Sequence, residues 1–267
     1  MNSREFQQHI FSWWEKNRRN LPWRHTHDPY RIFISEIMLQ QTQVERVTAK
    51  YHEFLARFPR ISDLASAPLR DVLVLWKGLG YNRRAMFAQK TALDIVKKYY
   101  GVFPKDPALL MTLPGIGVYT AKAVCVFAYK MDLPLVDTNI RKIITHFFYN
   151  DVVQKEKEIE KKALELLPKG KSWEWNQALM DFGALELSKL LPKAKSKNRS
   201  IPFKDTNRFV RGKIIDALRE RSYRKKELLS LLSELTHRTD EVLEKNLQSL
   251  IKEGLVAVIN GEYSLGS

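Results

Sequence analysis

Apolar residues recur at the three- and four-residue spacing of an amphipathic helix along nearly the whole chain. Prolines and short polar runs divide this pattern, and Asp28-Pro29 is a typical helix start. No strand pattern occurs before residue 250. The sequence therefore predicts an all-α body. The expected helices cover residues 3–18, 30–42, 44–57, 62–67, 69–76, 82–99, 107–112, 118–129, 138–149, 155–166 and 173–187.

The end of the chain has a different pattern. Three helical segments are followed by two short alternating runs around Asn260-Gly261, which is a strong hairpin signal because a type I′ turn needs positive φ at both positions. This order predicts a small winged-helix-like domain over residues 201–267. Its third helix carries four acids and two lysines, so DNA binding in the major groove and a role in binding a protein partner both stay open. The three helices are expected at 207–220, 224–235 and 239–253.

The charge of the chain favours a polyanionic partner. Lys and Arg number 45 against 30 Asp and Glu, a formal net charge of +15, which is most often associated with nucleic acid. Residues 188–211 hold eight basic side chains, one acid and two prolines. We expect this segment to be a linker, either a solvated tether or a DNA contact.

Cysteine content and hydropathy point to a compartment. The one cysteine, Cys125, lies in an apolar run and allows neither an internal disulfide nor a thiolate metal cage. No signal peptide opens the chain, and no apolar run approaches the roughly 20 residues of a membrane span. We expect an intracellular, cytoplasmic protein.

The segment LPGIGVYTAKA, residues 113–123, has the features of a DNA-backbone clamp. Pro114 ends a helix, while Gly115 and Gly117 allow a tight turn and a close approach to a ligand. The helix that starts at Val118 presents free N–H groups and a positive dipole end, which suit a phosphate. Since the segment lacks a nucleotide P-loop pattern and follows no strand, it predicts a helix–hairpin–helix that binds DNA without reading its sequence.

Two acids stand in apolar surroundings. Glu36 has apolar neighbours on a predicted buried helix, where a carboxyl takes up a proton and suits a general acid. Asp137 follows an apolar run at a helix start, where it is either an N-cap or an ionised group that stabilises a cation. Such a pair cleaves glycosidic bonds through an oxocarbenium-like state, and removal of a base from deoxyribose develops similar charge. The sequence by itself does not show that the two acids meet.

Five motifs together closely resemble the helix–hairpin–helix (HhH-GPD) DNA glycosylase superfamily, and within it the MutY-type adenine DNA glycosylases. The resemblance covers residues 5–190 and implies two helical lobes with a DNA cleft between them, one lobe over 29–136 and the other over 1–28 and 137–200. It implies a monomeric base-excision repair enzyme, nucleoid-associated, acting on double-stranded DNA with a mismatched or damaged base. The motifs are LPWR…DPYRIFISEIMLQQTQV, WKGLGYNRRA, LPGIGVYTAKAV, VDTNIRKI and WNQALMDFGAL.

The resemblance implies roles for the residues around the acids. Glu36 corresponds to the acid that protonates adenine, and Asp137 to the aspartate that stabilises the oxocarbenium ion. Tyr119 stands where lyase-competent relatives such as endonuclease III carry a Schiff-base lysine, and a phenol cannot form that imine. A monofunctional enzyme is therefore implied. Asn139 and Arg24 correspond to polar groups that hydrogen-bond around the acids.

Further residues correspond to DNA contacts. Gln41 matches the residue that is wedged into the base stack when the base is flipped, and Gly115 and Gly117 match the hairpin. Tyr81 and Asn82 match a loop near the opposite base. Lys122, one turn after Tyr119, is interpreted as a phosphate contact or a surface lysine, and it is the first residue to consider if lyase activity exists.

The chain departs from the family pattern in three places. Most MutY-type enzymes hold a [4Fe–4S] cluster with four cysteines. This chain has no cysteine at the matching positions, so we expect no cluster and no other metal here. The usual larger C-terminal domain, which helps to recognise 8-oxoguanine, is replaced by the winged-helix-like segment, and GLGYY is replaced by GLGYN. The preferred base opposite adenine therefore stays open. The residues at the cluster positions are Glu186, Lys193, Ser196 and Pro202.

The predicted function is hydrolysis of the N-glycosidic bond of mismatched adenine, opposite 8-oxoguanine or guanine, after base flipping. Three alternatives stay open: a thymine/uracil mismatch glycosylase of the same superfamily, a bifunctional glycosylase/lyase, and a non-catalytic DNA-binding regulator that uses the winged helix. The EIMLQQTQV segment favours adenine, and the presence of both acids argues against the regulator.

Overall fold

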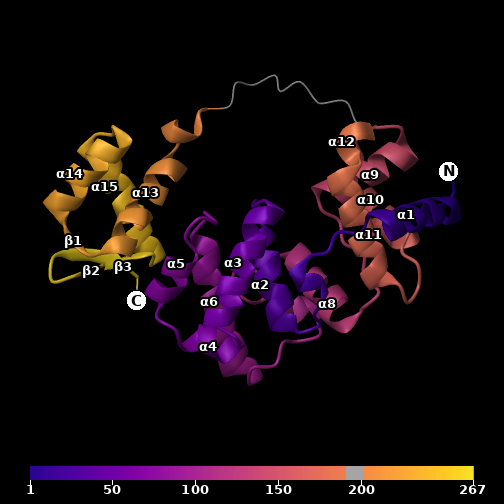
Figure 1. Ribbon diagram of the computed structural model, residues 1–267, viewed down its shortest axis with the longest axis horizontal. Helices are drawn as coiled ribbons and strands as arrows, with labels where there is room; N and C mark the ends of the chain where they lie inside the picture. Colours follow the sequence, from indigo (N-terminus) through magenta and orange to yellow (C-terminus); the bar gives the residue numbers. More distant parts are fainter. Residues whose placement is uncertain (191–200, 267) are drawn as a thin grey trace. The chain divides into compact units, whose positions relative to one another are not determined.

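The computed structural model describes residues 1–190 and 201–266, and the described chain is mostly helical. Figure 1 shows helices throughout and one small sheet near the C-terminus. Two compact units are formed: Met1–Glu36 with Phe103–Lys195, and Ile37–Val102 with Ser196–Ser267. The helical fold class predicted from the sequence is confirmed. The lobes and their limits stay a prediction.

The first unit is built around two helices that pack together, the N-terminal helix α1 (Ser3–Asn17) and α11 (Ser172–Leu185). α1 begins with a capping box in which Asn2 and Glu5 bond each other's backbone N–H groups. α1 packs on α11, and aromatic rings fill their interface: Phe6 lies 5.8 Å from Trp175 between ring centroids. The helices of this unit are α1 (Ser3–Asn17), η1 (Pro22–Arg24), α7 (Pro107–Met111), α8 (Val118–Tyr129), α9 (Thr138–Tyr149), α10 (Glu156–Glu165), α11 (Ser172–Leu185) and α12 (Leu187–Leu190).

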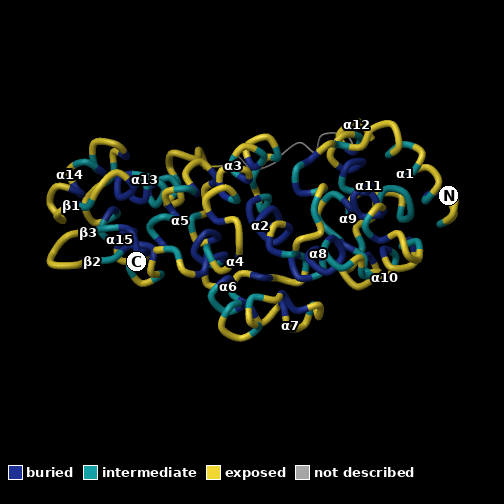
Figure 2. Tube along the Cα trace, turned by 60° about the horizontal axis from the view of Figure 1, so that its bottom comes forward, coloured by how far each residue is buried: buried dark blue, intermediate teal, exposed yellow. Residues whose placement is uncertain are grey.

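α2 (Pro29–Leu39) runs from the first unit into the second and is buried along most of its length (Figure 2). Its start is fixed by Pro29 at the first helical position and by Asp28, whose Oδ1 accepts from the Tyr30 N–H at 2.9 Å. The sequence predicted a helix to residue 42, but it ends at Leu39, and Gln41 has φ +54°. Gln41 therefore lies in a turn after the helix.

The second unit contains a helical part followed by the C-terminal domain, which we define as residues 201–266. In the C-terminal domain, α13, α14 and α15 are followed by the predicted hairpin, in which Val258 pairs with Tyr263 and both turn residues, Asn260 and Gly261, have positive φ. The elements are α3 (Val44–Arg57), α4 (Ile61–Ser66), α5 (Leu69–Leu75), α6 (Arg83–Tyr99), η2 (Phe203–Asp205), α13 (Asn207–Glu220), β1 (Tyr223–Arg224), α14 (Lys225–Thr236), α15 (Asp240–Glu253), β2 (Val256–Ile259) and β3 (Glu262–Leu265).

β1 corrects the expectation that no strand precedes residue 250. It pairs antiparallel with β3, so the sheet order is β1-β3-β2. β1 has two residues, Tyr223 and Arg224, and is too short to show the alternation of buried and exposed positions that marks a strand in a sequence. Its formation depends on β3 as a partner.

Candidate active site

Glu36 is a buried acid on α2. Glu36 is only 8% exposed, and its neighbours in the helix, Ile34, Ile37 and Met38, are buried as well. Burial, and next the negative charge of Asp137, raises the pKa of Glu36 from 4.5 to about 7. Glu36 is therefore poised to hold a proton near neutral pH and to release it, as a general acid must.

Asp137 is the N-cap of α9, and its Oδ1 accepts from the Ile140 N–H at 2.7 Å. Burial raises the pKa of Asp137, while backbone hydrogen bonds from Ile140, Asn139 and Asp137 itself oppose that rise. The same hydrogen bonds and the positive end of the helix dipole favour the carboxylate form. The N-cap reading and the charged-group reading from the sequence are therefore compatible, because one carboxylate serves both.

Tyr119 completes a cluster with the two acids. It is the second residue of α8, it is half-buried, and its pKa lies well above the usual value because of burial and of the charges of Glu36 and Asp137. The charge of Asp137 thus raises the pKa of both Glu36 and Tyr119, and the charge of Glu36 also raises that of Tyr119. The structure brings together two acids that sequence reasoning could only place separately, and the charges of both act on the phenol of Tyr119.

The hairpin before α8 has the expected turn. Gly115 has φ +76°, a conformation that glycine adopts without strain, and Gly117 is the N-cap of α8. A Cβ atom at Gly117 would meet nothing within 4 Å, so the backbone is open to a ligand there. Lys122 points to a different partner, since its Nζ lies 3.4 Å from a carboxylate oxygen of Glu160. Its predicted role in binding phosphate stays a prediction.

Asn139 lies in the first turn of α9, where α9 packs on α11. Its Cβ would be 2.8 Å from a Cβ atom built at Gly183, a distance that real Cβ contacts essentially never show. Only glycine fits at this position of the MDFGAL motif without a shift of α9. Gly183 therefore allows the helix that begins at Asp137 to lie close to α11.

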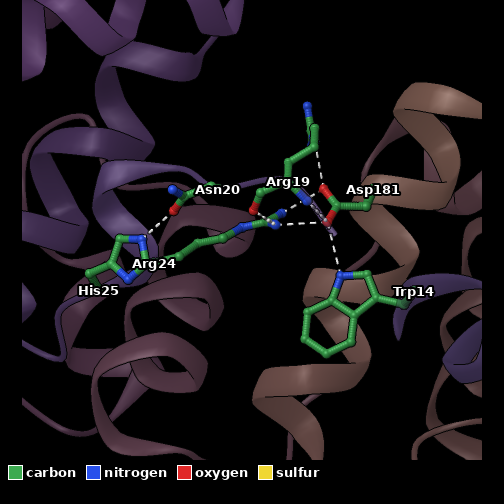
Figure 3. A network of polar contacts seen from close by, with 6 residues as sticks. All are labelled: Trp14, Arg19, Asn20, Arg24, His25 and Asp181. Carbon is green, nitrogen blue, oxygen red and sulfur yellow. Dashed lines mark hydrogen bonds and ion pairs between the residues drawn. The ribbon is translucent and has the colours of Figure 1, made fainter. Parts of the chain in front are cut away.

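Among the described residues, Arg24 forms its side-chain ion pair with Asp181 and not with the two candidate catalytic acids, Glu36 and Asp137. Its Nη1 and Nη2 donate to the two carboxylate oxygens of Asp181, each at 2.7 Å. Trp14 and Arg19 donate to the same carboxylate, as Figure 3 shows. Asp181 is fully buried on α11, and its role was missed in the sequence because a long-range acceptor leaves no local signal.

A buried arginine, Arg84, connects the loops that carry Gln41 and Tyr81. Its Nη1 donates to the carbonyl oxygens of Ile37, Met38 and Gln40, and its Nη2 donates to Thr42 Oγ1 and to the carbonyl oxygens of Leu79 and Gly80. Burial lowers the pKa of Arg84 to about 10, so the guanidinium is still charged at neutral pH. Arg84 therefore holds the turn after α2 and the GLGYN loop in one arrangement.

The residues at the family's cluster positions do not fit an iron–sulfur cluster. Glu186 caps α11 and pairs with Lys189 at 2.9 Å, while Lys193 and Ser196 lie outside the described residues. The chain's one thiol, Cys125, is buried on α8, donates to the Lys105 carbonyl, and has its pKa raised to about 11 by burial and by Asp106. Because the cluster needs several thiolates, no step of the chemistry below involves one.

The family of the chain follows from this fold and from sequence comparison. The model of the HhH-GPD superfamily of base excision DNA repair proteins matches residues 34–169, which include Glu36, the hairpin and Asp137. The chain belongs to this superfamily. This match, together with the similarity to relatives named adenine DNA glycosylase, confirms the predicted family and the predicted enzyme class, a DNA N-glycosylase.

Several relatives that are named as DNA glycosylases are similar to this chain. The adenine DNA glycosylase of Mycolicibacterium smegmatis is 33% identical over 281 residues, which cover 96% of this chain and 94% of the relative. That of Buchnera aphidicola subsp. Baizongia pistaciae is 39% identical over 196 residues, covering 72% of this chain but 56% of the relative. The thymine/uracil-DNA glycosylase of Methanothermobacter thermautotrophicus is 32% identical over 190 residues, covering 70% and 86%.

Solved structures of the superfamily share the fold. A thermostable thymine-DNA glycosylase has a TM-score of 0.67 and 32% identity, covering 72% of this chain and 90% of the neighbour. An endonuclease III–DNA covalent intermediate has a TM-score of 0.62 at 19% identity, covering 76% and 94%, and supports the fold alone.

Among the described residues, no helix has the length and apolar character needed to cross a membrane.

The raised pKa of Glu36 predicts a pH-dependent cost in stability. Below the unfolded-state value of 4.5 the carboxyl is protonated in both states, and above about 7 it is ionised in both. Between these values the folded state binds more protons, so stability falls as pH rises. We expect Glu36→Gln to stabilise the fold by about 3 kcal/mol at pH 8 and by little at pH 4.5.

Urea unfolding of both proteins at each pH measures this difference. Glu53→Gln makes the same charge change at an exposed residue and serves as the control. An equal gain from Glu36→Gln at both pH values would show that the pKa of Glu36 is not raised by the fold.

Proposed function

We propose that this superfamily member is a monofunctional adenine DNA glycosylase that hydrolyses the N-glycosidic bond of adenine mispaired with guanine or 8-oxoguanine in double-stranded DNA. The observation that carries the proposal is the pair formed by Glu36, with its pKa raised to about 7, and Asp137, whose charge contributes to that rise. The names of the relatives that span most of this chain support the choice of adenine. A cytoplasmic, nucleoid-associated monomer is proposed with it.

The two acids divide the chemistry. Glu36 donates its proton to a ring nitrogen of the flipped adenine, so that the bond from C1′ to the base breaks with its electron pair leaving on a neutral base. Positive charge then develops on the sugar, and the carboxylate of Asp137 stabilises it electrostatically. Water adds to C1′ and passes a proton to the Glu36 carboxylate, which restores the acid.

Other residues support this chemistry in the proposal. Asn139, close to Asp137 in the first turn of α9, hydrogen-bonds around the acids, and Arg24 orders the segment before α2 through Asp181. Gln41 enters the base stack when adenine leaves it. The hairpin glycines hold the DNA backbone, with Lys122 next to them. Tyr81 and Asn82 contact the DNA near the opposite base.

Base release from a panel of duplexes tests the proposed function. Purified protein is incubated with duplexes that contain adenine opposite guanine, 8-oxoguanine, cytosine or thymine, and alkali then converts abasic sites to strand breaks. We expect breaks at adenine opposite guanine or 8-oxoguanine and none in the matched duplex. A protein that releases no adenine from any mismatch contradicts the proposal.

A thymine/uracil mismatch glycosylase is the second candidate. It is favoured by the similarity, in sequence and in structure, to proteins named thymine/uracil-DNA and thymine-DNA glycosylase. The two candidates share the fold. The Glu36–Asp137 pair does not distinguish them either, since both reactions develop positive charge on the sugar. Duplexes with thymine or uracil opposite guanine belong in the same panel, and preferential release of either base would favour this candidate.

Tyr119 predicts the absence of lyase chemistry. A phenol forms no imine with C1′, and its raised pKa keeps the hydroxyl neutral. We expect borohydride to trap no covalent protein–DNA adduct during base release, and Lys122→Ala to leave that result unchanged. The measurement is denaturing electrophoresis of labelled duplex after reduction. An adduct that disappears in Lys122→Ala would instead identify Lys122 as a nucleophile.

A further inference from the structure

The C-terminal domain is fixed to the GLGYN loop through a buried arginine. Arg219 on α13 is 8% exposed, and its Nε donates to the Leu73 carbonyl at 2.9 Å while its Nη2 donates to Asn82 Oδ1 at 2.9 Å. α13 and β3 both contact α5, beside this loop (Figure 1). Within the second unit, therefore, this domain is docked on the loop rather than merely attached to it by the chain.

An exposed arginine of the same helix forms a stack with two aromatic rings. The guanidinium of Arg208 lies 5.1 Å from the centroid of the Tyr81 ring and 5.1 Å from that of Phe203. Arg208 also donates a hydrogen bond to the Tyr81 hydroxyl. Tyr81 and Phe203 are 38% and 54% exposed, so the stack is open to solvent although it contains two large aromatic side chains.

The charge in this stack is not neutralised by a neighbouring acid. Among the described residues, Arg208 forms no ion pair, whereas Arg83 and Arg211 nearby share Glu253. The loop that carries Tyr81 is held in place by Arg84, which donates hydrogen bonds to the carbonyls of Leu79 and Gly80. A cation, two exposed rings and a preorganised backbone are thus assembled from two parts of the chain that are distant in sequence.

We infer that Tyr81, Arg208 and Phe203 form a stacking site for an unstacked base of the DNA substrate. Aromatic and guanidinium planes stack on any base, and the positive charge complements the DNA backbone. A mismatched base leaves the duplex stack at a lower cost than a paired one, so such a site binds a mismatched duplex better than a matched one. The inference rests on the proposed function for the identity of the DNA, a mismatched duplex.

The site exists because the C-terminal domain is docked on the loop, since Arg208 and Phe203 come from that domain and Tyr81 from the loop. The inference therefore gives this domain a part in recognising the lesion, instead of the major-groove role of its third helix. In that helix, α15, Glu244 and Glu253 form ion pairs with basic residues, and its sequence contains no aromatic residue on which a base could stack.

Equilibrium binding tests the site without requiring catalysis. Fluorescence anisotropy is measured at one salt concentration with a duplex that carries 2′-fluoro-2′-deoxyadenosine opposite guanine, and with the same strand paired to thymine. The fluorine disfavours positive charge on the sugar and so prevents base release. We expect Arg208→Ala and Phe203→Ala each to weaken binding to the mismatched duplex about tenfold and to change binding to the matched duplex much less.

Arg221→Ala is the matched control. Arg221 belongs to the same domain and stacks at 3.9 Å on the ring of Tyr223, but that ring is buried and Glu227 pairs with the arginine. We expect this variant to lose the same charge with little change in mismatch preference. Thermal unfolding of all three variants confirms that each is folded.

Two results would overturn the inference: unchanged binding by Arg208→Ala and Phe203→Ala, or an equal loss on matched and mismatched duplexes, which indicates a phosphate contact only. Failure of the proposed function has a different signature. A wild-type protein that binds the mismatch selectively through this stack, yet releases no base from a natural mismatch, contradicts the glycosylase proposal and leaves the stacking site in place.

Discussion

Replacement of Glu36 by glutamine is expected to reduce the single-turnover rate of adenine release by about 10²–10⁴-fold, the usual contribution of a general acid. Glutamine has nearly the same shape and fills the same buried position, but its amide has no acidic proton to transfer to the adenine ring. In the wild-type protein the rate should fall as pH rises through about 7, because Glu36 then loses its proton. The variant should lack this pH dependence.

The loss must be separated from weaker DNA binding. We expect the Glu36→Gln protein to bind a mismatched duplex about as tightly as the wild type does, since the substitution removes chemistry and not a surface contact. Glu53→Gln, an equivalent change at an exposed position of α3, should leave the rate unchanged. Full activity in the Glu36→Gln protein would contradict the assignment of the acid.

Local chemistry made much of the fold predictable. Prolines, N-caps and apolar spacing place most helix limits within a residue or two, and α9 runs over 138–149 as expected because Asp137 caps it. Asn260-Gly261 predicted the hairpin for a similar reason, since the requirement for positive φ is local. Elements whose limits depend on a partner were harder: β1 was missed, and α2 ends earlier than its apolar pattern indicated.

The candidate site was predictable in its residue types and not in its contacts. Glu36 stood out because a carboxyl among apolar neighbours must be protonated or paired, and the structure raises its pKa as that reasoning requires. The meeting of Glu36 with Asp137, the pairing of Arg24 with Asp181 and the stacking of Arg208 on Tyr81 each join distant parts of the sequence. Such pairings follow from the fold, and residue spacing contains no signal for them.

Removal of the Asp181 carboxylate is expected to destabilise the first unit by about 3–5 kcal/mol, the range measured when one partner of a buried ion pair is deleted. Asp181 is fully buried and accepts hydrogen bonds from Trp14, Arg19 and Arg24. In Asp181→Ala the guanidinium of Arg24, whose side chain is 7% exposed, would be left without its counterion. A lowering of the thermal midpoint by roughly 10 °C is expected.

The acid dependence of unfolding identifies the cause of that loss. Burial by itself would raise the pKa of Asp181, but the hydrogen bonds and charges of Arg24 and Arg19 outweigh it and lower the pKa. Its stabilising contribution is therefore present above the unfolded-state value of 3.8 and is lost as pH falls through the lower folded-state value. The gap in stability between wild type and Asp181→Ala should accordingly be full near neutral pH and narrow only in strong acid.

A surface pair provides the comparison that decides whether burial is responsible. Glu165 accepts from Ser3 and Lys162, so it also connects α1 to another helix, but its side chain is 52% exposed. Glu165→Ala should cost less than about 1 kcal/mol, because water replaces the lost contacts. Asp181→Asn, which keeps a hydrogen-bond acceptor but loses the charge, should fall between wild type and Asp181→Ala. If Asp181→Ala costs no more than Glu165→Ala, the four-residue network does not hold α1 and the segment that follows it against α11.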